Sequence, residues 1–167
     1  MNRPDFRYAA REDVPLILRF IRELADYEGL LDEVVADEKT LEGRIFDKRK
    51  AEVIFVLENG GEVGFALFFN NFSKLLGRAG IYLENLYVKP EHRGKGYGKA
   101  ILTRLAGIAK ERGCGRLEWW CLDRNTPGVN SRLSLGVEPM SDRTVYGIAG
   151  ETLDRIAEND RRTGEDK

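Results

Sequence analysis

The stretch Arg93-Gly94-Lys95-Gly96-Tyr97-Gly98-Lys99 lies between a strand-like segment and a strongly helical one, and it places three glycines within five residues. Glycines allow backbone N–H groups to converge, and the helix that follows adds its free N–H groups and the positive end of its dipole. This arrangement predicts a site for an anion, and phosphate is the natural candidate. The alternative is a flexible turn whose three cations are simply solvated.

Two familiar nucleotide-binding loops do not fit this spacing. A Walker A loop needs Gly-x-x-x-x-Gly-Lys followed by Ser or Thr, but Lys99 is followed by Ala100 and no glycine stands at the required distance before Gly98. A dinucleotide-binding turn needs Gly-x-Gly-x-x-Gly, whereas Gly94, Gly96 and Gly98 alternate, late in the chain and after strands expected to be antiparallel. Both readings are therefore excluded.

Outward from this turn, the spacing of apolar residues predicts a single α/β (α+β) domain over residues 1–150, followed by a polar tail, partly helical or frayed, over 151–167. The turn itself is preceded by a strand from Ile81 to Val88 and followed by a helix from Ala100 to Gly113. The other expected elements are, in chain order, a strand at Phe6–Ala9, a helix from Asp13 to Gly29, a weaker helix from Asp37 to Ile45, a hairpin of strands Glu52–Glu58 and Glu62–Phe69 around Asn59-Gly60-Gly61, a strand at Leu117–Leu122, a short helix at Pro127–Leu135 and a last strand at Thr144–Ala149.

Composition excludes several classes of protein. The 167 residues include 27 Lys and Arg against 28 Asp and Glu, for a net charge of −1, which argues against a nucleic-acid binder. The longest apolar run, Val53 to Leu57, is far shorter than the roughly twenty residues that span a membrane, and no signal peptide is evident. A cytoplasmic protein is expected. Cys114, Cys121 and the lone His92 have no metal-ligand spacing, so no metal is predicted.

The pattern Arg93-x-x-Gly96-x-Gly98 resembles the acyl-CoA pyrophosphate loop of the GNAT superfamily of N-acetyltransferases. The strand Tyr82-Leu83-Glu84-Asn85-Leu86-Tyr87-Val88 before it and Asn125-x-Pro127 after the next strand strengthen this resemblance. It implies the GNAT acyl-CoA N-acyltransferase fold, with a mixed central sheet of about six to seven strands flanked by helices, and acetyl-CoA as cosubstrate. Within the superfamily, Leu24-Ala25-Asp26-Tyr27-Glu28 and Tyr82-Leu83-Glu84 are most similar to the diamine (spermidine/spermine) acetyltransferases.

The resemblance also implies roles for individual residues. Tyr27, Glu28 and Glu84 would face the amine substrate, and the protein would form a homodimer. The cofactor would be held by Leu86, Tyr87, Val88, Arg93, Gly94, Lys95, Gly96, Tyr97, Gly98, Lys99 and Asn125.

Acetylation of an alkylamine requires removal of a proton, because an ammonium with a pKa near 10.4 is only about one part in 2,500 neutral at pH 7. Glu84 lies in an otherwise apolar strand and is suited to bind the cation and relay its proton. The alternative is a strand carboxylate that points to solvent. Glu28, with Asp32 and Glu33 soon after, would make the mouth of the cleft acidic, or would form no more than a solvated loop.

The chain departs from the family at the group that would protonate the leaving thiolate. The diamine acetyltransferases carry a Tyr on the helix after the Asn-x-Pro turn, and Arg132 occupies that position here. A guanidinium keeps its proton, so Arg132 could stabilise a thiolate only by its charge, and surface packing or a phosphate contact are equal alternatives. Other candidate donors are Tyr146, Ser131, Ser134 and ordered water.

These observations predict an N-acetyltransferase that moves acetyl from acetyl-CoA to a primary amine of a small cationic acceptor, polyamine-like or lysine-like, by direct attack in a ternary complex. Two alternatives remain. One is a GNAT enzyme for another acceptor, such as an antibiotic or a protein N-terminus. The other is a CoA-binding module that lost catalysis when Arg132 replaced the Tyr.

Overall fold

The structure is a computed structural model that describes residues 4–121, 136–142 and 144–164. The chain forms two compact units, Met1–Arg132 and Leu133–Lys167. The expected boundary between a domain and a tail at residue 150 stays a prediction.

The first unit is built on one mixed sheet, whose strands lie in the order β1-β2-β3-β4-β5. The first three pairings are antiparallel, and β5 pairs parallel with β4. The hairpin between β2 and β3 turns at Asn59 and Gly60, which have φ of 51° and 80°, as the Asn-Gly signal predicts. The strands are β1 Asp5–Tyr8, β2 Glu52–Glu58, β3 Gly61–Ser73, β4 Arg78–Val88 and β5 Leu117–Trp119.

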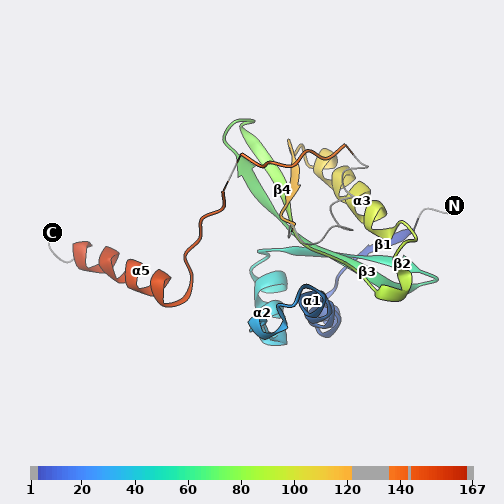
Figure 1. Cartoon of the computed structure of the whole chain (residues 1–167), viewed down its shortest axis with the longest axis horizontal. Coiled ribbons are helices and arrows are strands. Elements are labelled where there is room, and N and C mark those ends of the chain that lie inside the picture. Colours follow the sequence, from blue (N-terminus) through green and yellow to red (C-terminus); the bar gives the residue numbers. More distant parts are fainter. Residues whose placement is uncertain (1–3, 122–135, 143, 165–167) are drawn as a thin grey trace. The chain divides into compact units, whose positions relative to one another are not determined.

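One face of the sheet is covered by α1 Val14–Glu28 and the short α2 Glu38–Glu42 (Figure 1). Helix α1 ends where Gly29 adopts a left-handed conformation with φ of 73°. The centre of this interface is Phe20, which is fully buried, with ring centroids 5.4 to 6.2 Å from those of three aromatic residues of the sheet. The core on this side consists of Ile17, Phe20, Ile45, Val53, Phe55, Phe65, Leu67 and Tyr87.

The opposite face is covered by α3 Tyr97–Glu111 (Figure 1). Its apolar residues recur at helical spacing and are buried, with Ile101, Leu105 and Ile108 no more than 1% exposed. The sheet therefore separates α1 and α2 from α3. The short helices of this unit are η1 Arg11–Asp13, η2 Leu31–Glu33, η3 Gly43–Asp47 and η4 Pro90–His92.

The sheet has five strands among the described residues, whereas about six to seven were expected. The predicted strand at Thr144–Ala149 is wrong, because this segment is irregular and Tyr146 is 90% exposed. A strand depends on hydrogen bonds to a neighbour, and none of the described strands pairs with it. The strand expected at Leu117–Leu122 ends at Trp119 as β5, and the helix expected at Pro127–Leu135 lies outside the described residues.

In the second unit, Gly150–Gly164 forms helix α5. It carries Leu153 and Ile156, three residues apart and each 48% exposed. None of the helices in the described parts of the chain has both the length and the apolar composition to cross a membrane.

Candidate active site

Strand β4 carries an extra residue at Glu84. The consecutive β3 residues Leu67 and Phe68 pair with Asn85 and Leu83, so Glu84 has no opposite residue on β3. Such a bulge bends the strand and redirects its side chains. Glu84 and Asn85 consequently line the same pocket, although neighbouring residues of a regular strand point to opposite faces.

Among the described residues, the pairing of β4 with β5 ends just before this bulge. Strand β5 pairs with β4 from Ile81 to Leu83 and no further, so the residues after Leu83 have no described strand on that edge. Leu86 and Val88, which were predicted to contact the cofactor through their backbones, lie on this part of β4. Unpaired backbone N–H and C=O groups at a strand edge can bind an extended ligand.

The glycine-rich turn lies beside this edge. Gly94 and Gly96 have φ of 76° and 86°, a left-handed conformation that favours glycine, and Gly96 is the residue before α3. A Cβ at either position would meet no heavy atom within 4 Å, while a Cβ at Gly98 would lie 3.9 Å from Leu86 on β4. The turn thus leaves open space next to the free N–H groups of the first turn of α3, which fits a phosphate group.

The side chains of the turn contact other parts of the protein. Arg93 donates a hydrogen bond through Nε to the carbonyl of Val88 at 3.0 Å. Lys95 Nζ and the Tyr97 hydroxyl donate to Glu58 Oε1 on β2 at 3.2 and 2.7 Å. The sequence did not indicate Glu58, because it stands almost forty residues before the turn.

A pocket of about 340 Å³ is lined by both Glu28 and Glu84, two of the three residues expected to face the amine. Glu33 lines it as well, so three carboxylates from α1, η2 and β4 share one pocket. Its described lining holds no Lys or Arg, and its other side chains are mainly apolar. They are Ile21, Leu24, Ala25, Leu30, Val34, Val35, Ala36 and Asn85.

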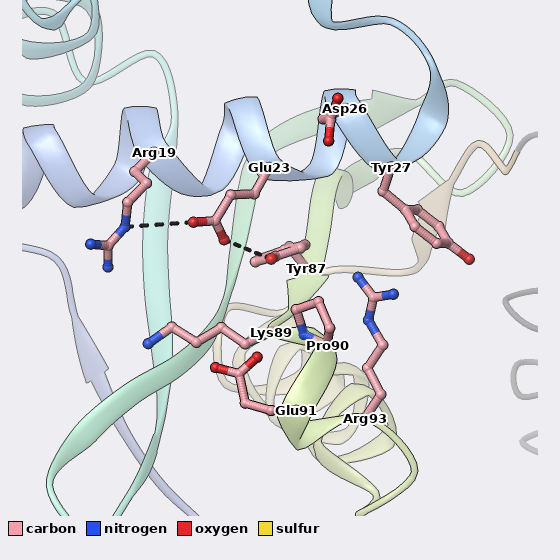
Figure 2. Close-up of a pocket in the computed structure, with 9 residues that line it drawn as sticks. All are labelled: Arg19, Glu23, Asp26, Tyr27, Tyr87, Lys89, Pro90, Glu91 and Arg93. Carbon is pink, nitrogen blue, oxygen red and sulfur yellow. Dashed lines mark hydrogen bonds and ion pairs between the residues drawn. The ribbon is translucent and has the colours of Figure 1, made fainter.

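Tyr27 lies in a neighbouring pocket of about 550 Å³, shown in Figure 2. The guanidinium carbon of Arg93 is 4.5 Å from the centre of the Tyr27 ring. In the same pocket, the Tyr87 hydroxyl donates to Glu23 at 2.6 Å, and burial together with this contact raises the pKa of Tyr87. Tyr87 is 4% exposed, so its side chain belongs to the core.

Several predicted site residues are not placed by this structure. Asn125, Arg132, Ser131 and Ser134 lie outside the described residues. Tyr146 is described within the second unit, where it is exposed. The roles assigned to these residues, like those of Glu28, Glu84 and the turn, stay predictions.

Comparisons with known proteins identify the family of this chain. Residues 19–131 match the Acetyltransferase (GNAT) family. A thialysine N-epsilon-acetyltransferase of Bos taurus is 37% identical over 163 residues, which cover 90% of this chain and 95% of that protein. A spermidine/spermine N(1)-acetyltransferase-like protein 1 of Homo sapiens is 32% identical over 143 residues, which cover 81% of this chain and 20% of that protein.

The fold is also found among solved structures. An integron cassette protein from the mobile metagenome of V. cholerae superimposes with a TM-score of 0.77 at 23% identity, covering 94% of this chain and 99% of that one. The predicted GNAT fold, with its mixed sheet and flanking helices, is therefore confirmed. The chain belongs to the GNAT family of acetyltransferases and is a GNAT N-acetyltransferase that is similar to the thialysine N-epsilon-acetyltransferases and, over part of its length, to a diamine acetyltransferase-like protein.

Proposed function

We propose that this protein acetylates a primary amine of a small acceptor that carries at least two positive charges, such as a diamine or polyamine. The observation that supports this acceptor class is the pocket shared by Glu28, Glu33 and Glu84. Three carboxylates attract positively charged molecules. They also favour an acceptor that carries a second positive charge in addition to the amine that reacts.

A lysine-like acceptor is the second candidate, and the name of the thialysine N-epsilon-acetyltransferase favours it. An amino acid carries an α-carboxylate that a binding site normally pairs with Lys or Arg. The described lining of the acidic pocket provides neither, while Ile21, Leu24 and Val34 suit a plain methylene chain. These features favour a diamine over an amino acid.

The thioester of acetyl-CoA supplies the acyl group. Gly94, Gly96 and the first turn of α3 would hold its pyrophosphate through backbone N–H groups, because the space above the turn is open. The backbone of β4 at Leu86 and Val88, which has no described strand beside it on this edge, would hold the pantetheine arm. Asn125 would add a polar contact, as the family resemblance implies.

Glu84 would bind the reacting ammonium and take its proton, directly or through a water molecule. Glu84 is exposed, lies on the bulge, and lines the acidic pocket just beyond the point where the described pairing of β4 with β5 ends. A base at this point would be within reach of an amine that approaches β4 from the acidic pocket. Direct attack in a ternary complex follows if both substrates occupy these neighbouring sites together.

The CoA thiolate can leave without a strong proton donor. Its pKa near 8.5 means that a thiolate leaves at small cost near neutrality, so the absence of the family's Tyr at position 132 is compatible with turnover. Arg132 would then assist through its positive charge. A CoA-binding module without catalysis is the alternative that this substitution keeps open.

The test is release of free thiol from acetyl-CoA with matched acceptors: putrescine, butylamine, lysine, an aminoglycoside and a short peptide with a free N-terminus. We expect putrescine to be used far better than butylamine, which has the same chain length but one charge. Preference for lysine, the aminoglycoside or the peptide would reject the diamine assignment. Binding of acetyl-CoA without thiol release from any acceptor would favour the binding module.

A homodimer is also expected from the family resemblance. Light scattering on the purified full chain distinguishes a dimer from a monomer of 19.0 kDa.

A further inference from the structure

One carboxylate fastens the glycine-rich turn at three points. Glu58, the last residue of β2, accepts hydrogen bonds at Oε1 from the Tyr97 hydroxyl at 2.7 Å and from Lys95 Nζ at 3.2 Å. Its other oxygen, Oε2, lies 2.8 Å from Nδ1 of His92, although the imidazole is not aligned to donate a hydrogen bond there. These partners all lie between His92 and Tyr97, the first residue of α3.

The partners stand on both sides of the glycines. His92 precedes Gly94, Lys95 lies between Gly94 and Gly96, and Tyr97 follows Gly96. Two glycines in left-handed conformations give a free segment many alternative backbone states, and ordering it costs conformational entropy. Contacts that flank both glycines reduce this freedom before any ligand arrives.

We propose that Glu58 is a positioning residue for acetyl-CoA, which holds the glycine-rich turn, with the Lys95 side chain, in its phosphate-binding conformation. This inference rests on the proposed binding of acetyl-CoA at the turn. Glu58 itself would touch neither the cofactor nor the amine. It would act by lowering the entropy that cofactor binding must overcome.

The charge of the Glu58 carboxyl suits a role in holding the turn. The hydrogen bond from Tyr97 and the nearby Lys95 lower the pKa of the Glu58 carboxyl below its usual value, so it is ionised at neutral pH. The Glu58 side chain is 27% exposed and that of Lys95 is 51% exposed. The Lys95 side chain can therefore be held by Glu58 without being buried.

The experiment compares Glu58→Ala and Tyr97→Phe with the control Glu111→Gln. Glu111 lies at the other end of α3, 64% exposed, and pairs with Arg104 at 3.3 Å. For each protein we would measure kcat, the KM of acetyl-CoA, the KM of the amine, and the rate of trypsin cleavage after Lys95 with and without acetyl-CoA.

Glu58→Ala should raise the KM of acetyl-CoA about tenfold, as expected when a binding loop loses its preorganisation, while kcat and the amine KM change little. Trypsin should cleave faster after Lys95, and saturating acetyl-CoA should restore protection. Tyr97→Phe should show the same effects to a smaller degree, and the control should match the wild type.

An unchanged KM for acetyl-CoA in both variants would overturn the inference. A lower KM would overturn it too, because Glu58 would then be competing with the phosphates for Lys95. If the wild type itself fails to bind acetyl-CoA in a titration, the proposed function falls along with this inference. A wild type that binds while the variants bind equally well rejects only the role of Glu58.

Discussion

Replacing Tyr27 with leucine tests whether the pocket that contains Tyr27 serves acetyl-CoA while the acidic pocket serves the amine. The guanidinium of Arg93 lies 4.5 Å from the centre of the Tyr27 ring, and the ring is 52% exposed. Arg93 also donates a hydrogen bond to Val88 at 3.0 Å and lies 5.8 Å from the centre of the Tyr87 ring, so the substitution removes one of the contacts that hold Arg93. Because Tyr27 does not line the acidic pocket, we expect the loss to fall on the cofactor and not on the amine.

The size of the effect follows from the exposure of the contact. A cation–π contact at an exposed site contributes about 0.5–1 kcal/mol, which corresponds to roughly a twofold to fivefold change in affinity at 25 °C. Tyr27→Leu should therefore raise the KM of acetyl-CoA by that factor and leave the KM of the amine unchanged. Steady-state thiol release with each substrate varied in turn measures both constants.

Tyr27→Phe is the matched control, since it keeps the ring and removes only the hydroxyl. It should behave like the wild type. A rise confined to the KM of the amine would refute this reasoning and support the role that the family resemblance implies, in which Tyr27 faces the acceptor. Equal effects of both substitutions would show that the hydroxyl matters and the stacking does not.

Further predictions concern the reaction and the stability of the fold. Glu84→Gln should lower kcat by about a hundred- to ten-thousand-fold, which is the usual contribution of a general base. Its affinity for acetyl-CoA, measured by calorimetry, should not change. If the variant turned over at the wild-type rate at every pH, Glu84 would not be the base. Arg132→Tyr should keep or raise turnover if position 132 faces the thioester, whereas weaker cofactor binding in the same titration would assign Arg132 to a phosphate. Phe20→Ala should cost about 3–5 kcal/mol of unfolding free energy in urea, because it empties the centre of the core. Arg7 lowers the pKa of Asp13 below 3.8, so the stability from this pair is complete above that unfolded-state value and is lost as pH falls through the lower folded value. Urea unfolding of Asp13→Asn against the wild type should show a difference at pH 7 that disappears in strong acid.

Features determined by neighbouring residues were predictable from the sequence. Helix α1 ends at Gly29 because a left-handed residue terminates a helix, and the β2–β3 hairpin turns at Asn59-Gly60 because both residues accept positive φ. The glycine-rich turn before α3 belongs to the same class. In each case the conformation depends on a few adjacent residues.

Features that depend on distant contacts were not predictable in this way. No local pattern marks the bulge at Glu84, because it is defined by the register of β4 against β3. The direction of Tyr27 depends on Arg93, and the role of Glu58 depends on Tyr97, both far away in the sequence. The segment Thr144–Ala149 has the composition of a strand, but composition does not provide the neighbouring strand that it would need.

The bulge at Glu84 changes which residues of β4 share a face. Opposite residues of paired strands lie on the same face, so Leu83 lies on the face of Phe68 and Tyr87 lies on the face of Phe65. In a regular strand, two residues four apart would share a face, and the extra residue places Leu83 and Tyr87 on opposite faces. Deleting Glu84 would leave these two residues three apart, so both would keep their faces and β4 could pair regularly with β3. A single-codon deletion would therefore remove the carboxylate and straighten the strand at the pocket, while both layers of the core would stay in register.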